Sequence, residues 1–399
     1  MGETRPVRIL HLSAADIMLY PILREQLLFL RGLGYEVHTA SLDGPLARRL
    51  RDEDRFPWTA LPLTRKFSPW ADWRAVGFIR EFCRAGRFDL VHTHTPKGNL
   101  VGQYAARRAG VPIVFQTLHG FYLHEHMNWF ERQAWIRLER FSARQSDLIL
   151  FQNPEDVETA RRERIAAGEK IVLLGNGINL ERFRPGLLTA GERAAYREKL
   201  GLPAEALVVG MCGRFVRGKG FPEFLEAGRL LCARFPNLRL LAIGHRLESE
   251  RAGEVWTPES IGLPPDRLVV LHDRDDLPEL YACMDVHVLP SRREGFPRVL
   301  MEGAACGLPQ AATDIRGCRQ TITEGETGFL VPVGEAGRLA ERIGQMLADG
   351  ELRARFGRAA RAKAEREFDQ RPVFRRVAES YAKLLARKLP NLTVPAARG

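Results

Sequence analysis

Short apolar runs alternate with longer amphipathic stretches along this chain, and the alternation occurs in two successive series. Strands that alternate with helices in this way predict parallel sheets with right-handed crossovers. The apolar runs lie at residues 7–12, 35–40, 89–92, 112–116 and 148–151 in the first series and at 207–211, 238–243, 268–271 and 286–289 in the second. Amphipathic helices rich in arginine are expected from residue 336 onward. The pattern therefore predicts an α/β protein with two doubly wound domains.

A boundary between the two series is indicated by the densest cluster of Gly, Asn and Pro, which spans residues 175–186. A chain of 399 residues also exceeds what one hydrophobic core usually serves. We predict a Rossmann-like domain at 1–185, a second at 186–370, and a C-terminal helix and tail at 371–399 that pack back towards the first domain. Because ligands bind at the carboxyl ends of the strands in such folds, we expect the reaction in a cleft across which the two domains face each other.

The charge of the chain is positive throughout, with a formal net charge of +11 that is spread over both halves. Of the 60 basic residues 52 are arginine, which is typical of a genome that favours arginine codons. An anionic membrane surface and a phosphate-bearing substrate are compatible with this charge. Nucleic acid is not an expected partner, because no RNA- or DNA-binding motif accompanies the basic residues.

The cysteines and the apolar runs indicate the cellular compartment in which the protein is expected. The six cysteines are at least 12 positions apart and include no C-x-x-C pair, so we expect free thiols in a reducing compartment. No apolar run reaches the ~18–20 residues that span a bilayer, and the first residues lack the apolar core of a signal peptide. We expect a soluble, cytoplasmic protein.

A glycine-rich basic loop, residues 213–220, directly follows the predicted strand at 207–211. Its glycines allow backbone N–H groups to approach a phosphate closely. Arg214 can donate two hydrogen bonds to a pyrophosphate, and Lys219 adds a point charge. The loop is not a Walker A motif, because Gly220 follows Lys219 where that motif requires Ser or Thr. An ordinary basic turn between strand and helix is the alternative interpretation.

A second polar loop follows the predicted strand at 286–289 and contains Glu294, with Glu302 eight positions further along. Pro297 is expected to be the first helical residue, so that the N–H groups of Gly295 and Phe296 and the helix N-terminus can bind an anion. A carboxylate repels an anion, so we expect both glutamates to accept hydrogen bonds from hydroxyl groups, as of a sugar and a ribose. The alternative is that they are ordinary charged residues of a solvated helix.

Together these two loops resemble the family-4 retaining glycosyltransferases, which carry a Gly-Arg…Lys-Gly loop and a later Glu, seven residues, Glu motif. The resemblance extends over residues 269–291, 317–332 and 176–185, and so over nearly the whole chain. It implies the GT-B architecture of two Rossmann-like domains, and transfer of a sugar from a nucleotide-sugar, expected to be a UDP-sugar. It also implies a reaction that requires neither a metal ion nor a cofactor.

Carried onto this sequence, the resemblance implies a role for each motif residue. Arg214 and Lys219 would hold the diphosphate, Glu302 the ribose, and the N–H groups of Gly295 and Phe296 the sugar or phosphate. The catalytic residues would be Glu294, beside the reacting carbon, and His119, which matches the sugar-contacting histidine of the family. The departing diphosphate oxygen would take the acceptor proton, so that the sugar retains its configuration.

The acceptor is expected on the N-terminal domain, where Ser13, His94 and Lys97 follow predicted strands. Family members commonly carry Gly-Gly at the position of Ser13 and Ala14, so this chain departs from the pattern there. His92 and His94 would share one face of a strand, but no Asp or Cys lies nearby at ligand spacing, so a metal site is not predicted. The two D-x-D sequences, 52–54 and 273–275, are also interpreted as non-metal sites.

An aromatic and basic stretch, residues 56–73, suggests contact with an anionic membrane surface on the inner face of the cell membrane, through Arg65, Lys66, Trp70 and Trp73. The alternative is that its aromatic side chains pack beneath the loop. The resemblance is strongest to enzymes that build bacterial surface polysaccharides, which favours an acceptor sugar on polyprenyl diphosphate. Alternatives are a small soluble acceptor, a UDP-sugar 2-epimerase of the same architecture, and a non-catalytic binder.

Overall fold

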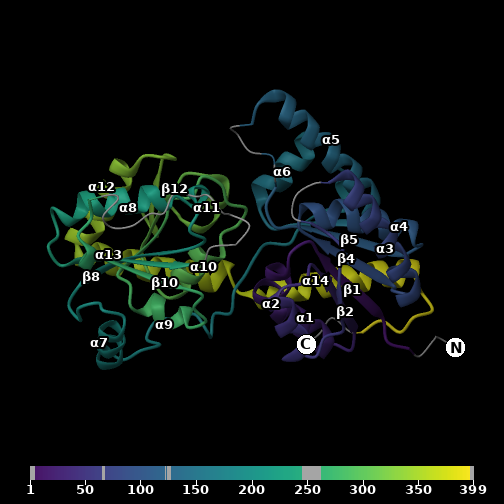
Figure 1. The fold of residues 1–399 in the computed structure, drawn as a ribbon, viewed down its shortest axis with the longest axis horizontal. Helices are drawn as coiled ribbons and strands as arrows, with labels where there is room; N and C mark the ends of the chain where they lie inside the picture. Colours follow the sequence, from purple (N-terminus) through teal and green to yellow (C-terminus); the bar gives the residue numbers. More distant parts are fainter. Residues whose placement is uncertain (1–4, 65–67, 122, 124–126, 245–261, 396–399) are drawn as a thin grey trace. The chain divides into compact units, whose positions relative to one another are not determined.

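The computed structural model describes residues 5–64, 68–121, 123, 127–244 and 262–395. It divides into two compact units, which we describe separately (Figure 1). Unit 1 comprises residues 1–175 together with 371–399, and unit 2 comprises residues 176–370. Each is built on one parallel sheet covered by helices, which confirms the prediction of two doubly wound α/β domains.

The described residues of unit 1 contain a seven-stranded sheet with the order β3-β2-β1-β4-β5-β6-β7. Its strands are β1 (Arg8–Ser13), β2 (Glu36–Ser41), β3 (Trp58–Ala60), β4 (Leu90–His94), β5 (Ile113–Leu118), β6 (Leu148–Phe151) and β7 (Ile171–Leu173). Its α-helices are α1 (Arg24–Gly32), α2 (Pro45–Asp52), α3 (Pro69–Gly86), α4 (Gln103–Arg108), α5 (Trp129–Gln145) and α6 (Pro154–Arg162), joined by α14 (Gln370–Lys388) from the end of the chain. The strand order changes direction between β1 and β4, which is where such sheets bind ligands.

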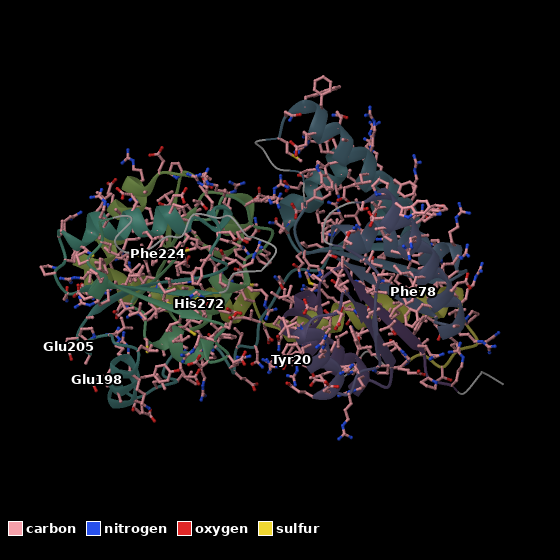
Figure 2. All side chains as sticks on the ribbon, viewed as in Figure 1. Tyr20, Phe78, Glu198, Glu205, Phe224 and His272 are labelled. Carbon is pink, nitrogen blue, oxygen red and sulfur yellow. The ribbon has the colours of Figure 1, made fainter. Side chains whose placement is uncertain are left out.

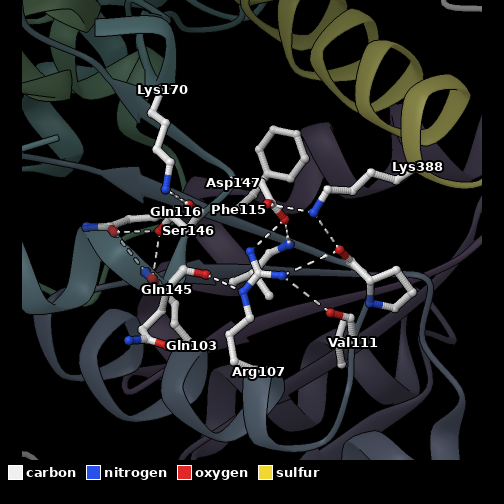
Figure 3. Close-up of polar contacts among 12 residues, drawn as sticks. Gln103, Arg107, Val111, Phe115, Gln116, Gln145, Ser146, Asp147, Lys170 and Lys388 are labelled. Atoms are coloured by element: carbon white, nitrogen blue, oxygen red, sulfur yellow. Dashed lines mark hydrogen bonds and ion pairs between the residues drawn. The ribbon is translucent and has the colours of Figure 1, made fainter. Parts of the chain in front are cut away.

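Helix α14, drawn in yellow in Figure 1, returns to unit 1 and completes its core. Val377, Tyr381 and Leu385 recur at helical spacing and are buried among residues of β1, β4 and β5. Ion pairs of Asp147 stabilise the end of this helix (Figure 3). Lys388 Nζ lies 2.7 Å from Asp147 Oδ1, and Arg107 lies 2.7 Å from Asp147 Oδ2.

The described residues of unit 2 contain a six-stranded sheet with the order β10-β9-β8-β11-β12-β13. Its strands are β8 (Leu207–Cys212), β9 (Leu238–Gly244), β10 (Leu268–His272), β11 (Val286–Leu289), β12 (Gln310–Thr313) and β13 (Gly328–Val331). Its α-helices are α7 (Ala190–Lys199), α8 (Phe221–Cys232), α9 (Leu277–Ala282), α10 (Arg298–Ala305), α11 (Arg316–Thr321), α12 (Ala336–Ala348) and α13 (Gly350–Glu367). Phe224 of α8 anchors the core on one face of this sheet (Figure 2).

The division between the units falls after Gly175, earlier than the predicted boundary between residues 185 and 186. The reason is the packing of the segment after Gly175. Ile178 and Phe183 are buried in a core cluster of unit 2, and the Ile178 N–H donates to the Phe368 carbonyl at 2.9 Å. The Gly/Asn/Pro cluster therefore begins at the boundary and continues into unit 2.

Four strands, β3, β7, β12 and β13, were not among the predicted apolar runs. β3 and β7 have three residues each and lie at the edges of their sheet. β12 reads Gln-Ala-Ala-Thr, which carries little strand propensity, yet all four of its residues are buried between β11 and β13. The sheet context, more than the local sequence, makes these segments strands. Within the described helices, no segment is both long and apolar enough to cross a bilayer.

Candidate functional site

The two predicted phosphate and carboxylate loops follow neighbouring strands at the switch point of the unit 2 sheet. β8 and β11 pair in parallel, with Val209 opposite Val286 and Met211 opposite Val288. The sheet order reverses between these two strands, so their carboxyl ends form the crevice in which ligands of such sheets bind. The loop after β8 carries Arg214 and Lys219, and the loop after β11 carries Glu294.

The two loops are fitted closely to each other. Residues Arg217–Lys219 form a turn of 3-10 helix, and Gly220 ends it with φ +76°. A Cβ atom at Gly220 would overlap the carbonyl oxygen of Pro290, so only glycine allows this approach. The Arg292 N–H also donates to the Gly218 carbonyl at 3.0 Å. The backbone therefore sets the distance between Lys219 and the second loop.

Lys219 and Glu294 form an ion pair, with Lys219 Nζ 2.6 Å from Glu294 Oε1. The Ser291 hydroxyl donates to the same oxygen at 2.7 Å. Glu294 has only 9% of its side chain exposed, whereas Lys219 has 24% exposed. A Cβ at Gly317 would lie 2.8 Å from Glu294 Cβ, so α11 covers the glutamate on another side. Thus the carboxylate is held in one orientation, with a cation beside it.

Arg214 lies half-buried at the start of the first loop, and its backbone is part of a tight turn in which the Val216 N–H donates to its carbonyl at 2.8 Å. The neighbouring Phe215 is buried, with its ring centroid 5.0 Å from that of Phe221 and 5.3 Å from that of His272. This packing anchors the loop between β8 and α8 and leaves Arg214 near the carboxyl end of β8.

Glu302 lies in the middle of α10 and is buried, with 7% of its surface exposed. The Tyr281 hydroxyl lies 3.1 Å from Glu302 Oε2, and Arg298 Nε lies 4.0 Å from Oε1. Burial raises the pKa of Glu302, and Arg298 and the Tyr281 hydroxyl reduce that rise. A shielded carboxylate with fixed orientation is suited to accept hydrogen bonds from a diol.

Pro297 is the N-cap of α10, with φ −72° and ψ 110°, and the first helical residue is Arg298 rather than Pro297 as predicted. The reason is that ψ of Pro297 is still extended, which turns the chain into the helix one residue later. Gly295 and Phe296 precede it in the loop, and the Phe296 carbonyl accepts from Asn176 Nδ2 at 3.3 Å. The helix start therefore lies next to the loop that holds Glu294.

In unit 1 the predicted acceptor residues gather at the switch point between β1 and β4, where Ser13 and His94 occupy opposite positions. Ser13 is buried and its hydroxyl donates to the Ala15 carbonyl at 3.0 Å. A Cβ at Gly98 would lie 3.2 Å from the backbone nitrogen of Ala14. Gly98 therefore allows the turn after β4 to approach the backbone at the end of β1 closely.

Lys97 is buried, with 5% of its side chain exposed, and its Nζ lies 2.6 Å from Asp72 Oδ1 of α3. It also donates to the Thr64 hydroxyl at 3.0 Å. Lys97 therefore ties the turn after β4 to α3. Arg65 and Lys66 lie outside the described residues, whereas Trp70 and Trp73 are 75% and 65% exposed on α3.

His119 follows β5 and contacts His94, with His94 Nδ1 3.0 Å from His119 Nε2. His94 Nε2 in turn lies 3.0 Å from Nδ1 of His11 on β1, a residue that the sequence analysis did not select. The parallel register of β1 and β4 places His11 opposite His92. A correct prediction of that register would have selected His11. Burial lowers the pKa of His11 to about 3 and lowers those of His92 and His94 below the ordinary value.

The two D-x-D sequences are engaged in local contacts. Asp54 accepts two hydrogen bonds from Arg24, at 2.7 and 2.6 Å, and Asp52 pairs with Arg51 at 2.7 Å. The carbonyl of Asp275 accepts from Arg182 at 2.9 Å.

Two family models match the chain, one to each predicted domain. A glycosyl transferase 4-like domain matches residues 22–177, and a model described as glycosyl transferases group 1 matches residues 192–363. These matches include the loops that carry His119, Lys219 and Glu294.

Curated relatives cover most of the chain. The capsular polysaccharide biosynthesis glycosyltransferase CapM of Staphylococcus aureus is 28% identical over 379 residues, which are 94% of this chain and 96% of CapM. A galactosyltransferase of Escherichia coli, named as transferring from UDP-Gal to alpha-D-GlcNAc-diphosphoundecaprenol, is 29% identical over 73% of this chain and 74% of its own length.

Solved structures agree on the fold. Anabaena HepE, crystallised with UDP and glucose, superposes with a TM-score of 0.78 at 22% identity and covers 94% of this chain and 100% of HepE. A glycosyltransferase from Rickettsia africae gives a TM-score of 0.77 at 22% identity, over 96% of this chain and 99% of the other.

Proposed function

This chain belongs to the family-4 glycosyltransferases, and we propose that it transfers a sugar from a UDP-sugar to a lipid-linked sugar acceptor with retention of configuration. The observation that carries the proposal is the ion pair of Lys219 with Glu294 at the switch point of unit 2. It combines a cation for a diphosphate with a shielded carboxylate for a sugar, within one pair of interlocked loops. The relatives that act in capsule and glycan synthesis support the same kind of reaction.

The donor nucleotide would be held by unit 2. Arg214 and Lys219, which follow β8, would bind the diphosphate, and Glu302 on α10 would accept hydrogen bonds from the ribose. The N–H groups of Gly295 and Phe296, next to the start of α10, would contact the sugar or phosphate. A solved structure of the same fold, HepE, contains UDP, which supports a uridine nucleotide as the donor.

The chemical step would be substitution on one face of the sugar. The bond between the anomeric carbon and the diphosphate oxygen breaks, and the acceptor oxygen bonds to that carbon from the same side. The departing diphosphate oxygen takes the acceptor proton. Lys219 and Arg214 stabilise the charge that develops on the diphosphate, and Glu294 stabilises the positive charge that develops on the sugar. His119 would orient the sugar.

No metal ion or cofactor is needed in this proposal, because Arg214 and Lys219 supply the positive charge that a divalent cation would otherwise bring. The measurement is transfer after dialysis against EDTA. Unchanged turnover supports the proposal, and activity that returns only with added Mg²⁺ or Mn²⁺ contradicts it.

The acceptor would be presented at a membrane, which the exposed aromatic face of α3 supports. Trp70, Trp73, Arg74 and Phe78 are exposed at positions i, i+3, i+4 and i+8, and so share one side of the helix. Tryptophan rings and an arginine on one side of a helix suit the headgroup region of an anionic membrane. We propose peripheral attachment of the protein to the inner face of the cell membrane.

The membrane contact is tested by sedimentation with vesicles that contain anionic lipid. Trp73→Ala should weaken binding to the vesicles several-fold. Trp129→Ala is the matched control, because Trp129 lies on α5 and is 64% exposed, against 65% for Trp73. Equal binding by wild type and Trp73→Ala would contradict the proposal.

The reaction is tested by incubation with a panel of labelled UDP- and GDP-sugars, with and without polyprenyl-diphosphate sugars. Release of UDP that requires the lipid-linked acceptor, with a product of unchanged anomeric configuration, supports the proposal. Transfer only to small soluble sugars would refute the lipid-linked acceptor. A sugar epimerised without any acceptor would refute transfer itself.

A further inference from the structure

An unbroken line of hydrogen-bonded side chains runs through the buried sheet of unit 1 to His119. His119 Nε2 contacts His94 Nδ1 at 3.0 Å, and His94 Nε2 contacts His11 Nδ1 at 3.0 Å. His11 Nε2 lies 3.3 Å from the Tyr381 hydroxyl, which also contacts His92 Nδ1. The line ends where His92 Nε2 meets the Thr117 hydroxyl at 2.7 Å.

The interior members of this line are shielded from water. His11, His92 and Tyr381 are completely buried, and His94 is 1% exposed. Desolvation lowers the pKa of all three buried histidines, so they are neutral at pH 7. A neutral imidazole has one N–H donor and one acceptor nitrogen, and a tyrosine hydroxyl both donates and accepts. Each hydrogen bond between these groups therefore needs one donated proton, and each group has one proton to donate.

The hydrogen bonds of the line can therefore run in either of two directions. If the protons point from Thr117 towards His119, then His92, His11 and His94 all carry their proton on Nδ1, and His119 accepts at Nε2. If they point the other way, all three carry it on Nε2, and His119 donates from Nε2. The tautomer of His119 is thus tied to that of the whole line.

We propose that His94, His11 and Tyr381 are positioning residues that hold the His119 ring in one orientation and fix whether its Nε2 donates or accepts. This rests on the proposed function for the role of His119 towards the sugar. Tyr381 belongs to α14, so the C-terminal helix takes part in orienting His119, which follows β5 much earlier in the chain. The line explains why three histidines are buried side by side where apolar residues would otherwise pack.

A metal ion is the rival occupant of the same cluster, because ligand atoms of His11, His92 and His94 lie within 4.8 Å of one another. Two observations favour the hydrogen bonds. The 3.0 Å separation of His11 Nδ1 and His94 Nε2 is typical of a hydrogen bond, whereas a tetrahedral zinc ion with Zn–N bonds of about 2.0–2.1 Å holds its nitrogens roughly 3.3 Å apart. A bound ion would also displace protons from links that the line fully satisfies.

The experiment is ¹⁵N NMR of histidine-labelled protein, which distinguishes Nδ1–H from Nε2–H imidazoles. We expect His11, His92 and His94 to show one tautomer, the same for all three. Mixed tautomers among them would overturn the proposal. A stoichiometric shift of these signals on titration with zinc, at micromolar concentration, would assign the cluster to a metal and overturn it as well.

Tyr381→Phe cuts the line, and Tyr35→Phe is a matched control. Both tyrosines are buried in the same core, with ring centroids 6.1 Å apart, and Tyr35 has no hydrogen-bond partner for its hydroxyl among the described residues. We expect Tyr381→Phe to uncouple the tautomer of His92 from that shared by His11 and His94, and to lower kcat about tenfold with KM unchanged. Tyr35→Phe should leave both unchanged. Equal effects of the two substitutions would refute the positioning role.

A second cut tests the same line from another point. His94→Asn keeps a polar atom towards His119 and removes the one that faces His11, so it should reproduce the loss of kcat. Unchanged kcat in a folded His94→Asn protein would refute the proposal. Since the NMR spectra require no substrate, absence of transfer by the wild type would contradict the proposed function alone.

Discussion

Lys219 Nζ lies 2.6 Å from Glu294 Oε1, so the cation of the first loop of unit 2 neutralises the carboxylate of the second. A carboxylate next to an anion site is unfavourable by itself, because it repels the ligand. The ion pair with Lys219 and the hydrogen bond from Ser291 offset the cost of burying the Glu294 carboxylate. The two residues therefore form one unit, in which a change of either alters the electrostatics of the other.

Lys219→Ala and Glu294→Ala are each expected to lower kcat/KM at least about 100-fold, because each removes charge stabilisation in the transition state and leaves the partner charge unpaired. The measurement is UDP release with donor and acceptor present. Arg217→Ala is the control: it removes an exposed cation of the same 3-10 turn and should retain activity. Turnover like the wild type in Lys219→Ala or Glu294→Ala would exclude the assigned roles.

Gly220→Ala is expected to abolish donor binding, because the new Cβ overlaps the Pro290 carbonyl and φ +76° strains any side chain. Gly218→Ala is the matched control two residues away, since a Cβ there meets no atom within 4 Å. UDP binding measured by calorimetry should be lost in the first and kept in the second. Tight UDP binding by Gly220→Ala would show that the interlocked loops are not needed.

Asp147→Asn is expected to destabilise unit 1 by about 2 kcal/mol, because it removes the charged partner of Lys388 on α14 and of Arg107. Burial opposes ionisation of Asp147, but Lys388, the Val114 N–H and Arg107 together hold its pKa below the ordinary value. This contribution is therefore present at neutral pH and is lost as the pH falls through the pKa of the folded protein.

Urea unfolding followed by circular dichroism measures this effect. Asp43→Asn breaks an exposed pair with Arg48 and is the control, expected to leave the unfolding midpoint unchanged. Equal midpoints for Asp147→Asn and the wild type would show that the ion pairs of Asp147 do not stabilise unit 1.

The buried histidines predict how stability depends on pH. Unfolded imidazoles bind protons below about pH 6.5, whereas His11 stays neutral in the folded protein down to about pH 3. The unfolded state therefore binds more protons between these values, and the free energy of unfolding falls as the pH drops, by at most about 1.4 kcal/mol per pH unit for each histidine. Glu139, whose pKa burial raises to about 7, acts in the opposite direction.

A comparison of variants isolates the histidine contribution. Asparagine does not titrate. The difference in free energy of unfolding between the wild type and His11→Asn should therefore shrink as the pH falls from 7 to 4. His272→Asn, at an exposed position of β10, is the control. A deficit of His11→Asn that stays constant with pH would mean that His11 binds its proton equally in both states.

Local sequence was sufficient to predict the alternating elements. It also marked Lys219, Glu294 and Glu302 as candidate site residues, because strand ends and short glycine-containing loops carry their own signals. It located β8 and β11, and their parallel pairing then had to bring both loops together. It did not reveal β12, whose residues have little strand propensity and are placed by their neighbours.

The sequence by itself determined two doubly wound domains and the residues at the ends of their strands, since apolar periodicity and glycine loops act over a few positions. Only the tertiary structure decided that Lys219 and Glu294 form an ion pair and that His11 and Tyr381 join His92 and His94. Tyr381 is separated from His92 by 289 positions, and no local pattern marks the two as partners. Their contact exists because α14 returns to unit 1 and because the register of β1 on β4 stacks His11 beside His92.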